Sequence, residues 1–232
     1  MKLAVTQDLL TKYPHLRIGV ITGQGVNNMD TQPEIAKLTQ TAAETLRQRL
    51  TSETLPKHPY IAAWRDTYRS FGSKPSDFRP TAEALLRRIL RGDSVAPISA
   101  IVDIYLAIEM EYYLPIGGYD LDHVNGDITL RFSPGDEPFF AIGSATEEKT
   151  YAGEVVYADS EKILTRRWNY RDCDAAKITQ NSQSIALFCE APTPDVPTEH
   201  LMQLTQELAD RLGRFCGGTI SAQLLSGKDL MQ

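Results

Sequence analysis

The chain of 232 residues contains little cysteine and histidine, the residues on which disulfide frameworks and zinc sites depend. The number of cysteines is odd, and Cys173, Cys189 and Cys216 form no C-x-x-C pair, which argues against both kinds of structure. Cys189 lies inside the apolar run IALFC and is expected in the core. The four histidines are scattered along the chain. We therefore expect no metal and no cofactor.

Long apolar segments are missing as well. No stretch approaches about 18 uninterrupted apolar residues, the length needed to span a membrane. Asp8 interrupts the first residues before an apolar segment of secretory length can form, which argues against a signal peptide. These absences predict a cytoplasmic protein with no membrane partner. The G-x-S-x-G and G-x-x-x-x-G-K-[ST] signatures are also absent, so neither a serine nucleophile elbow nor a P-loop is expected.

The net charge of −6 argues against general binding of nucleic acid, and DNA is not expected as a partner. The charge is nevertheless uneven. Residues 64–91 hold seven basic and three acidic residues, whereas residues 92–158 hold twelve acidic and two basic ones. An RNA backbone could bind the first region and avoid the second, or these charges could form ordinary solvated helix faces. The candidate contacts to such an RNA backbone are Arg65, Arg69, Arg87, Arg88 and Arg91.

The period of the hydrophobic pattern changes along the chain. Helical spacing predicts helices over residues 33–50, 61–71, 80–91, 98–110 and 198–216. A period of two predicts strands over residues 16–22, 128–132, 139–142, 154–158, 163–167 and 185–190. This order predicts an α+β fold, with N-terminal helices packed on a mostly antiparallel sheet and a closing C-terminal helix over 198–216. We expect one domain, 1–232, with residues 1–59 as an N-terminal strand and helix extension.

Two segments combine residue types that suit a binding site. The segment 114–122, LPIGGYDLD, contains tandem glycines that would let a backbone approach a ligand closely or would form a tight turn. The segment 164–172, LTRRWNYRD, contains three arginines, a tryptophan, an asparagine and an aspartate. Such residues could hold a phosphate or stack on a base, or they could form an arginine–acid network that holds a turn over the sheet.

A series of residues between positions 60 and 191 follows one order along the chain. They are Trp64, Tyr68, Gly72, Pro75, Phe78-Arg79-Pro80, Glu83-Ala84-Leu85, Pro97-Ile98, Ile101-Val102-Asp103, Glu111, Pro115, Tyr119-Asp120-Leu121-Asp122, Gly126, Ile128, Arg131, Gly135-Asp136 and Ala158-Asp159. With these residues in this order, residues 60–191 resemble the tRNA-editing domain, modules B3 and B4, in the beta subunit of bacterial phenylalanyl-tRNA synthetase.

This resemblance implies the architecture of that editing domain and a trans-acting aminoacyl-tRNA deacylase, in which a positioned water hydrolyses the ester of misacylated tRNA. The implied partners are the aminoacylated 3′ end of tRNA and an amino acid. The implied catalytic residues are Asp120, Asp172 and Asn169. The implied substrate-binding residues are Arg79, Gly117, Gly118, Tyr119, Asp122, Arg166, Arg167, Trp168 and Arg171. Asp103 and Glu111 are expected to tie their helix to the sheet rather than to enter the site.

The chain departs from the family pattern in two places and lacks the class II catalytic core, so it should not aminoacylate tRNA. Gly117 stands where the family usually has a histidine, and residues 166–172 replace a glycine-rich turn that is followed by a glutamate. Asp172 or Asp174 could substitute for that glutamate. The alternatives are a non-catalytic module that binds an RNA end or an amino acid, and a new small-molecule hydrolase. If the strand over 163–167 continues, Arg167 and Asn169 share one face and should line the pocket, with Asp172 nearby and Arg166 outside.

Overall fold

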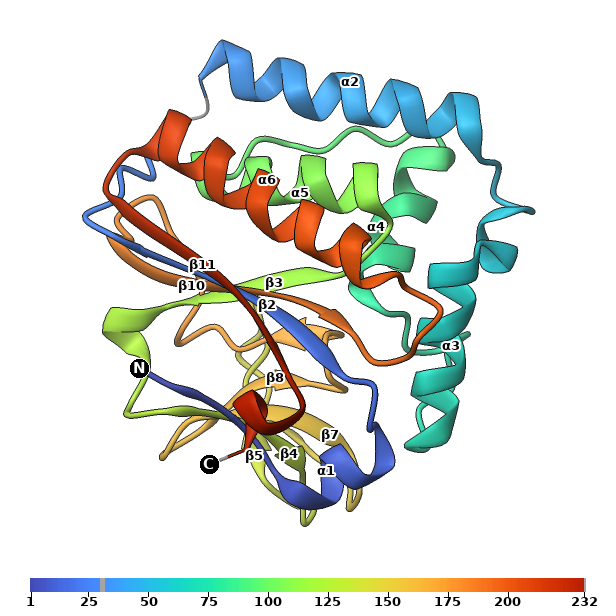
Figure 1. Ribbon diagram of the computed structural model, residues 1–232, viewed down its shortest axis with the longest axis vertical. Helices are drawn as coiled ribbons and strands as arrows, with labels where there is room; N and C mark the ends of the chain where they lie inside the picture. The colour runs from blue at the N-terminus through green and yellow to red at the C-terminus, as the bar shows by residue number, and fades with distance from the viewer. Residues whose placement is uncertain (30–31, 232) are drawn as a thin grey trace.

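The computed structural model describes residues 1–29 and 32–231, and its elements lie in four layers. In Figure 1 these layers are, from bottom to top, one sheet, a second sheet, a layer of two helices and an outer helix. The five-stranded sheet, which we call sheet A, has the order β1-β4-β7-β8-β9, and the four-stranded sheet B has the order β11-β2-β10-β3. The site described below lies where the two sheets and the helices meet.

Sheet A is antiparallel except for β1, which pairs in parallel with β4. Its strands are β1 (Leu3–Val5), β4 (Ile128–Phe132), β7 (Val155–Ala158), β8 (Ile163–Arg166) and β9 (Arg171–Asp172). Sheet B is antiparallel throughout, and its strands are β11 (Thr219–Ser226), β2 (Arg17–Gln24), β10 (Ser184–Ala191) and β3 (Ile116–Asp120). A short ribbon pairs β5 (Pro138–Phe139) with β6 (Glu148–Lys149).

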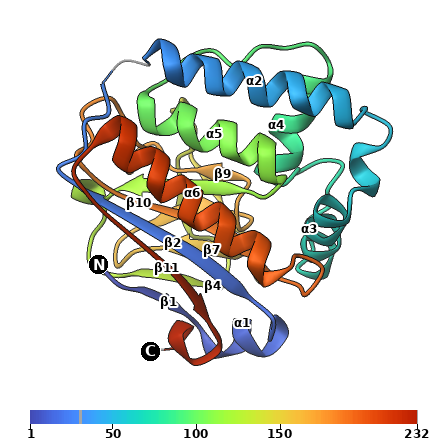
Figure 2. The ribbon, with the colours of Figure 1, turned by 45° about the horizontal axis from the view of Figure 1, so that its top comes forward.

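The helices are α1 (Gln7–Lys12), α2 (Pro33–Arg49), α3 (Pro59–Ser70), α4 (Thr81–Leu90), α5 (Ala100–Tyr112) and α6 (Thr198–Cys216). Helices α5 and α6 cover the face of sheet B that is turned away from sheet A, with α2 outside them, as Figure 2 shows, whereas α1 contacts β4 of sheet A. Three short 3₁₀ turns complete the chain: η1 (Leu55–Lys57), η2 (Leu121–His123) and η3 (Gly227–Leu230).

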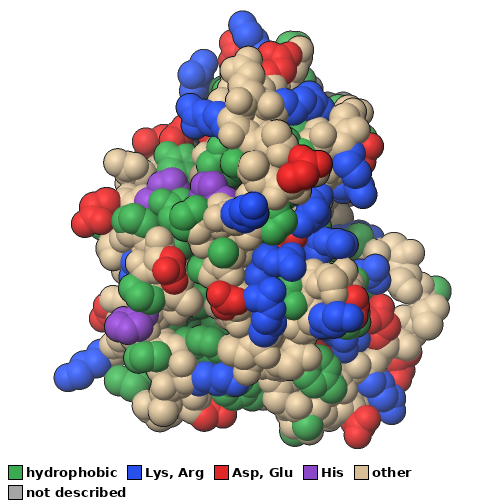
Figure 3. All heavy atoms as spheres, turned by 90° about the vertical axis from the view of Figure 1, so that its right-hand side faces the viewer, with side chains coloured by type: hydrophobic (Ala, Val, Ile, Leu, Met, Phe, Trp, Pro, Cys, Tyr) green, Lys and Arg blue, Asp and Glu red, His purple; other side chains and the backbone are tan. Residues whose placement is uncertain are grey.

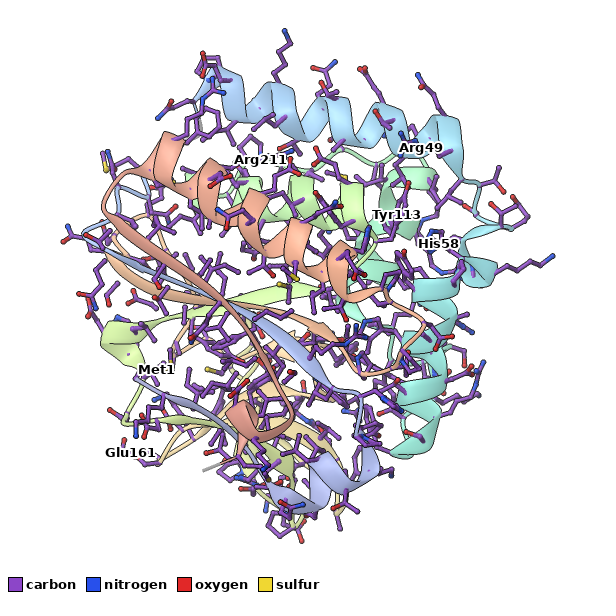
Figure 4. All side chains as sticks on the ribbon, in the orientation of Figure 1. Met1, Arg49, His58, Tyr113, Glu161 and Arg211 are labelled. Atoms are coloured by element: carbon purple, nitrogen blue, oxygen red, sulfur yellow. The ribbon has the colours of Figure 1, made fainter. Side chains whose placement is uncertain are left out.

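Three apolar cores hold the layers together. The first core lies between the two sheets and includes Val20, Leu130 and Phe188. A second core lies between sheet B and the helices α5 and α6, and a third joins α2, α4 and α5. The rings of His58 and Tyr113, whose centroids are 4.6 Å apart, pack the segment after η1 against the end of α5, as seen at the labels in Figure 4.

The α+β class is confirmed, and so are the mostly antiparallel pairing and the helix at 198–216. The structure adds elements that the hydrophobic pattern did not indicate, because they are short or exposed. Residues 1–59 also contain β1 and α1, and the helix α6 is followed by the edge strand β11. The predicted strand over 139–142 is only partly formed: β5 ends at Phe139, and Ala141 makes an isolated bridge with Cys173.

The expected role of Glu111 is wrong. We expected this residue to tie α5 to the sheet, but its carboxylate accepts hydrogen bonds from the Arg211 guanidinium of α6 at 2.7 and 3.2 Å. Asp103 accepts a hydrogen bond from the backbone N–H of Ile98 at 3.0 Å, just before α5 begins. These carboxylates therefore fasten α5 to the neighbouring helix and to the preceding loop.

Candidate active site

A cavity of about 100 Å³ opens between α5, the start of α4 and the two sheets. Its rim consists of partly or fully exposed residues, and its floor consists of buried ones. The rim residues are Thr81, Tyr105, Leu106, Gly117, Tyr170, Arg171 and Asp172. The floor residues are Ile116, Tyr119, Tyr157, Thr165, Trp168, Asn169, Phe188 and Glu190. The lining therefore combines aromatic rings, two carboxyl groups and one exposed guanidinium.

Strand β3 contributes Ile116, Gly117 and Tyr119 to this pocket. Gly117 and Tyr119 lie on one face of the strand, because side chains in a strand point to opposite faces. Gly118 lies on the other face, where an added Cβ would be 2.2 Å from the carbonyl oxygen of Ala186 on β10, so only glycine allows this approach. The structure thus brings Gly117 and Tyr119 to the pocket and leaves Gly118 in the sheet.

Asp120 also lies on the face of β3 turned away from the pocket. Its Oδ2 accepts a hydrogen bond from the Ser182 hydroxyl at 2.6 Å, and its Oδ1 accepts one from the backbone N–H of Asp122 at 3.1 Å. Asp122 itself is exposed in the turn that follows. The expectation that Asp120 and Asp122 surround the pocket is corrected on this point, because Asp120 is used to hold the turn after β3.

The turn from β8 to β9 explains which residues of the arginine-rich segment reach the pocket. The strand β8 ends at Arg166, and the next two residues have left-handed backbones, with φ of 48° at Arg167 and 69° at Trp168. The alternation of a strand therefore stops at this turn. The result is that Trp168, Asn169, Tyr170, Arg171 and Asp172 all line the pocket.

The prediction that Arg167 lines the pocket is wrong, because the left-handed backbone at Arg167 ends the alternation of β8. Its guanidinium instead lies over the ring of Phe78, 3.7 Å from the centroid, and near the rings of Tyr151 and Tyr170. Such cation–π contacts stabilise a guanidinium away from water. Burial lowers the pKa of Arg167, although the nearby Glu154 opposes that effect.

Arg166 belongs to a buried ion-pair network, as the structural reading of this segment anticipated. Its Nε and one terminal nitrogen donate to Glu154 at 2.8 and 2.9 Å, and its other terminal nitrogen donates to Glu148 at 2.8 Å. Glu154 also accepts from the backbone N–H of Arg167 at 3.0 Å. The Glu154 side chain is fully buried. Arg166 is therefore a scaffold residue that fixes the turn carrying the pocket residues.

Asp172 stands at the rim with its carboxylate directed toward the pocket. Thr165 on the paired strand donates a hydrogen bond to its Oδ1 at 2.5 Å, and the Thr165 hydroxyl is also hydrogen-bonded to Tyr119. Burial raises the pKa of Asp172 to about 6, against the lowering effect of the Thr165 hydrogen bond. A carboxyl with this pKa can exchange a proton near neutral pH, which is what a general base requires.

Glu190 is a pocket residue that sequence reasoning missed. It lies at the end of the apolar run of β10, two residues after Phe188, and this spacing places both on the pocket side. Its carboxyl accepts hydrogen bonds from the Tyr157 hydroxyl at 2.7 Å and the Asn169 amide at 3.5 Å, and Asn169 accepts one from Tyr68 at 2.7 Å. Burial raises the pKa of Glu190 to about 8.

Glu109 is a third carboxyl beside this pocket. It lies one helical turn beyond Tyr105 on the same face of α5, and its side chain is fully buried. Burial raises its pKa well above the usual range, and the charges of Asp172 and Glu190 add to the increase. The backbone at Ile116 opposes the increase through a hydrogen bond.

The cysteine thiols do not supply a nucleophile to this site. All three are buried, and burial raises the pKa of Cys189 to about 12 and that of Cys216 to about 11. The pKa of Cys173 is also raised by burial. A thiol must lose its proton to attack an ester, so raised pKa values disfavour this route.

The basic residues of α3 and α4 are divided between structural and exposed positions. Arg65 and Arg87 both donate to the fully buried carboxylate of Glu83, at 2.7 to 2.9 Å. Arg69, Arg88 and Arg91 are exposed. Arg69 pairs with Asp66, and Arg91 lies 3.9 Å from Asp93. Figure 3, which faces the side where α3 lies, shows Lys and Arg side chains gathered across this surface.

Arg79, a predicted substrate-binding residue, lies outside the pocket lining. It is partly exposed in the segment before α4, next to Phe78. Its Nε is buried and makes no hydrogen bond within residues 1–29 and 32–231. The structure therefore brings six of the predicted residues to the pocket beside Glu190; they are Gly117, Tyr119, Trp168, Asn169, Arg171 and Asp172.

The sequence matches the family model of the B3/4 domain over residues 63–217, which is more than half of the chain. The chain therefore belongs to the B3/4 domain family. The matched region contains the whole pocket, from Thr81 to Glu190.

The chain is also similar to two individual proteins. The chain is 33% identical over 79 residues to the phenylalanine–tRNA ligase beta subunit of Fusobacterium nucleatum subsp. nucleatum, a match that covers 34% of this chain and 10% of that protein. An N-terminal fragment of the phenylalanyl-tRNA synthetase beta subunit from Pyrococcus horikoshii is 10% identical, with a TM-score of 0.48. That match covers 97% of this chain and 54% of the fragment. In the part of the chain that the structure describes, no helix is both long and apolar enough to cross a membrane.

Proposed function

We propose that this chain is a trans-acting editing domain that hydrolyses the ester bond of misacylated tRNA. The observation that carries the proposal is Asp172, a carboxyl with a pKa of about 6 at the rim of an aromatic pocket. The aminoacyl group enters the pocket, and the ester carbonyl stays at the rim. Asp172 then orients a water and accepts its proton as the water oxygen bonds to the carbonyl carbon, and it returns that proton to the ribose oxygen of tRNA as the ester C–O bond breaks.

The other rim residues suit the polar end of this substrate. Arg171 is exposed beside Asp172, and its guanidinium lies 3.5 Å from Glu148 and near the ring of Tyr170. Such a guanidinium can donate hydrogen bonds to an ester carbonyl or to a phosphate. Tyr170 offers a ring on which the terminal base can stack. The floor residues then contact the amino-acid side chain.

The basic surface of α3 and α4 provides a second contact to tRNA. The exposed arginines of this surface are Arg69, Arg88 and Arg91. Among the described residues, none of the three forms a buried ion pair. They would bind the phosphate backbone while the 3′ end occupies the pocket. The membership of a family that occurs in phenylalanine–tRNA ligase beta subunits supports tRNA as the partner.

The test is hydrolysis of a panel of correctly and wrongly charged tRNAs by the purified chain. We expect release of the amino acid from a subset of wrongly charged tRNAs, and little from the cognate ones. If the chain binds the charged tRNAs and hydrolyses none, it is a binding module that lacks the editing chemistry. Gly117, which stands where the related editing domains usually carry a histidine, would then account for the loss.

A further inference from the structure

The carboxyl groups in and beside the pocket have no basic side chain as an ion-pair partner in the described chain. The charge of Asp172 raises the pKa of both Glu190 and Glu109, and the charge of Glu190 also raises the pKa of Glu109. Within residues 1–29 and 32–231, none of these three carboxyls forms a salt bridge with a lysine, arginine or histidine. Buried carboxyls without a cation are unusual in proteins, because each costs free energy when it ionises. A cation supplied by a ligand would remove this cost.

Glu109 strengthens this argument independently of the cavity. It is fully buried, and neither of its carboxylate oxygens reaches a side-chain hydrogen-bond donor in the described chain. It lies on the face of α5 that also presents Tyr105 and Leu106 to the pocket. The backbone at Ile116, which is itself a pocket residue, lowers the pKa of Glu109.

The chemistry of the lining identifies the kind of cation. The described acidic groups do not converge on one point as the ligands of a metal ion do. The pocket instead surrounds its centre with the rings of Tyr105, Tyr119, Tyr157, Trp168, Tyr170 and Phe188. Aromatic rings together with a carboxylate are a typical environment for an organic ammonium group.

We propose that the pocket selects an amino acid whose side chain ends in an ammonium group, with that ammonium at Glu190 and the ester at Asp172. The inference rests on the proposed function for the position of the ester. Asp172 lies at the partly exposed rim and Glu190 in the buried floor, so the α-carbon stays near the rim and only a side chain can reach Glu190. A cavity of about 100 Å³ favours a slender, unbranched side chain over a ring.

The experiment measures binding of two amino-acid amides to the full chain by isothermal titration calorimetry. L-Lysinamide and L-norleucinamide both have an unbranched four-carbon side chain, and only the first ends in an ammonium group. Because both are amides, binding is measured without ester hydrolysis. We expect lysinamide to bind at least about tenfold more tightly, a difference of about 1.4 kcal/mol. L-Tyrosinamide is measured as a third probe.

The matched variants are Glu190→Gln and Glu161→Gln. The first keeps the shape and hydrogen-bonding capacity of a pocket carboxyl and should remove most of the preference for lysinamide. The second removes an exposed carboxyl outside the pocket lining, labelled in Figure 4, and should keep the preference. Equal binding of norleucinamide, or tighter binding of tyrosinamide, to the wild-type chain would overturn the inference even if no variant folds.

The outcome separates this inference from the proposed function. If the chain hydrolyses misacylated tRNA but binds norleucinamide and lysinamide equally tightly, the proposed function is supported and this inference is contradicted. A chain that prefers lysinamide but hydrolyses no charged tRNA loses the function, and the pocket is then a binding site for the cationic amino acid.

Discussion

Gly117 and Asp172 face each other at the rim of the pocket, and a Cβ added to Gly117 would lie 3.8 Å from Asp172 Oδ2. This separation is an ordinary van der Waals contact, so the backbone tolerates a small side chain at position 117. A larger side chain would occupy the space in front of the carboxylate. Gly117 therefore keeps open the position that the ester and its water need.

We expect Gly117→Leu to lower kcat/KM on a misacylated tRNA at least about tenfold while the Tm changes by less than a few degrees. The adjacent Gly118→Ala is the matched control, because its Cβ would meet the carbonyl oxygen of Ala186 at 2.2 Å. That variant should lose stability or fail to fold. Thermal unfolding and steady-state kinetics of both variants check this prediction. Normal activity in a folded Gly117→Leu protein would show that this opening is not the route of the substrate.

Arg166→Met should destabilise the fold strongly, because it leaves Glu154 buried without its main partner. Breaking a buried pair costs about 3–5 kcal/mol, which corresponds to a fall in Tm of about ten degrees for a chain of this size. Arg171→Met is the control: its side chain is 51% exposed and its contact to Glu148 is 3.5 Å. It should cost less than about 1 kcal/mol. Equal Tm values for the two variants would contradict the scaffold role of Arg166.

Stability should fall as the pH rises from about 6 to 8, because of Glu190. Its pKa is about 8 in the folded protein and about 4.3 in an unfolded chain. In this range the folded state therefore holds a proton that the unfolded state has lost, and the free energy of unfolding decreases with pH until Glu190 is ionised. We expect the Tm to fall by a few degrees. Glu190→Gln should flatten this dependence and Glu161→Gln should not. A wild-type Tm that is constant over this range would contradict the raised pKa.

Replacing Arg69, Arg88 and Arg91 together with glutamine should weaken tRNA binding and reduce its salt dependence. Each lost phosphate contact lowers the slope of log K against log salt by about 0.7 to 0.9. Arg65→Gln is the contrast, because Arg65 pairs with buried Glu83 and its loss should lower the Tm instead. Fluorescence anisotropy with deacylated tRNA over a series of KCl concentrations measures the slope. An unchanged slope in the triple variant would show that these arginines are ordinary solvated residues that make no contact with the tRNA backbone.

Periodicity predicted the main helices and the long strands because these elements bury one face in a core. It did not indicate β1, α1 or β11, which are short or largely exposed and leave a weak pattern. The pocket was predicted in part. Asp172, Asn169 and Trp168 were found from their unusual composition, whereas Arg167 was misplaced because two left-handed residues end the alternation of β8.

Glu190 could have been found from the sequence. Glu190 lies near the end of an apolar strand, two residues after Phe188, so the two side chains are on the same face of that strand. A carboxylate on the buried face of an apolar strand indicates a residue of a functional site. Glu109 could not have been found in this way. Its burial depends on how α5 packs against sheet B, which local sequence does not specify.

The most direct test of the account is the turnover of a misacylated tRNA by the wild-type chain and by Asp172→Asn, with Asp122→Asn as the exposed control. Asparagine keeps the shape of the side chain and removes the proton acceptor. Asp172 forms no salt bridge with the Arg166 network, so the Tm should not fall. We predict a loss of about a hundredfold or more in kcat for Asp172→Asn and none for Asp122→Asn. Turnover near the wild-type rate in a folded Asp172→Asn protein would contradict the central claim.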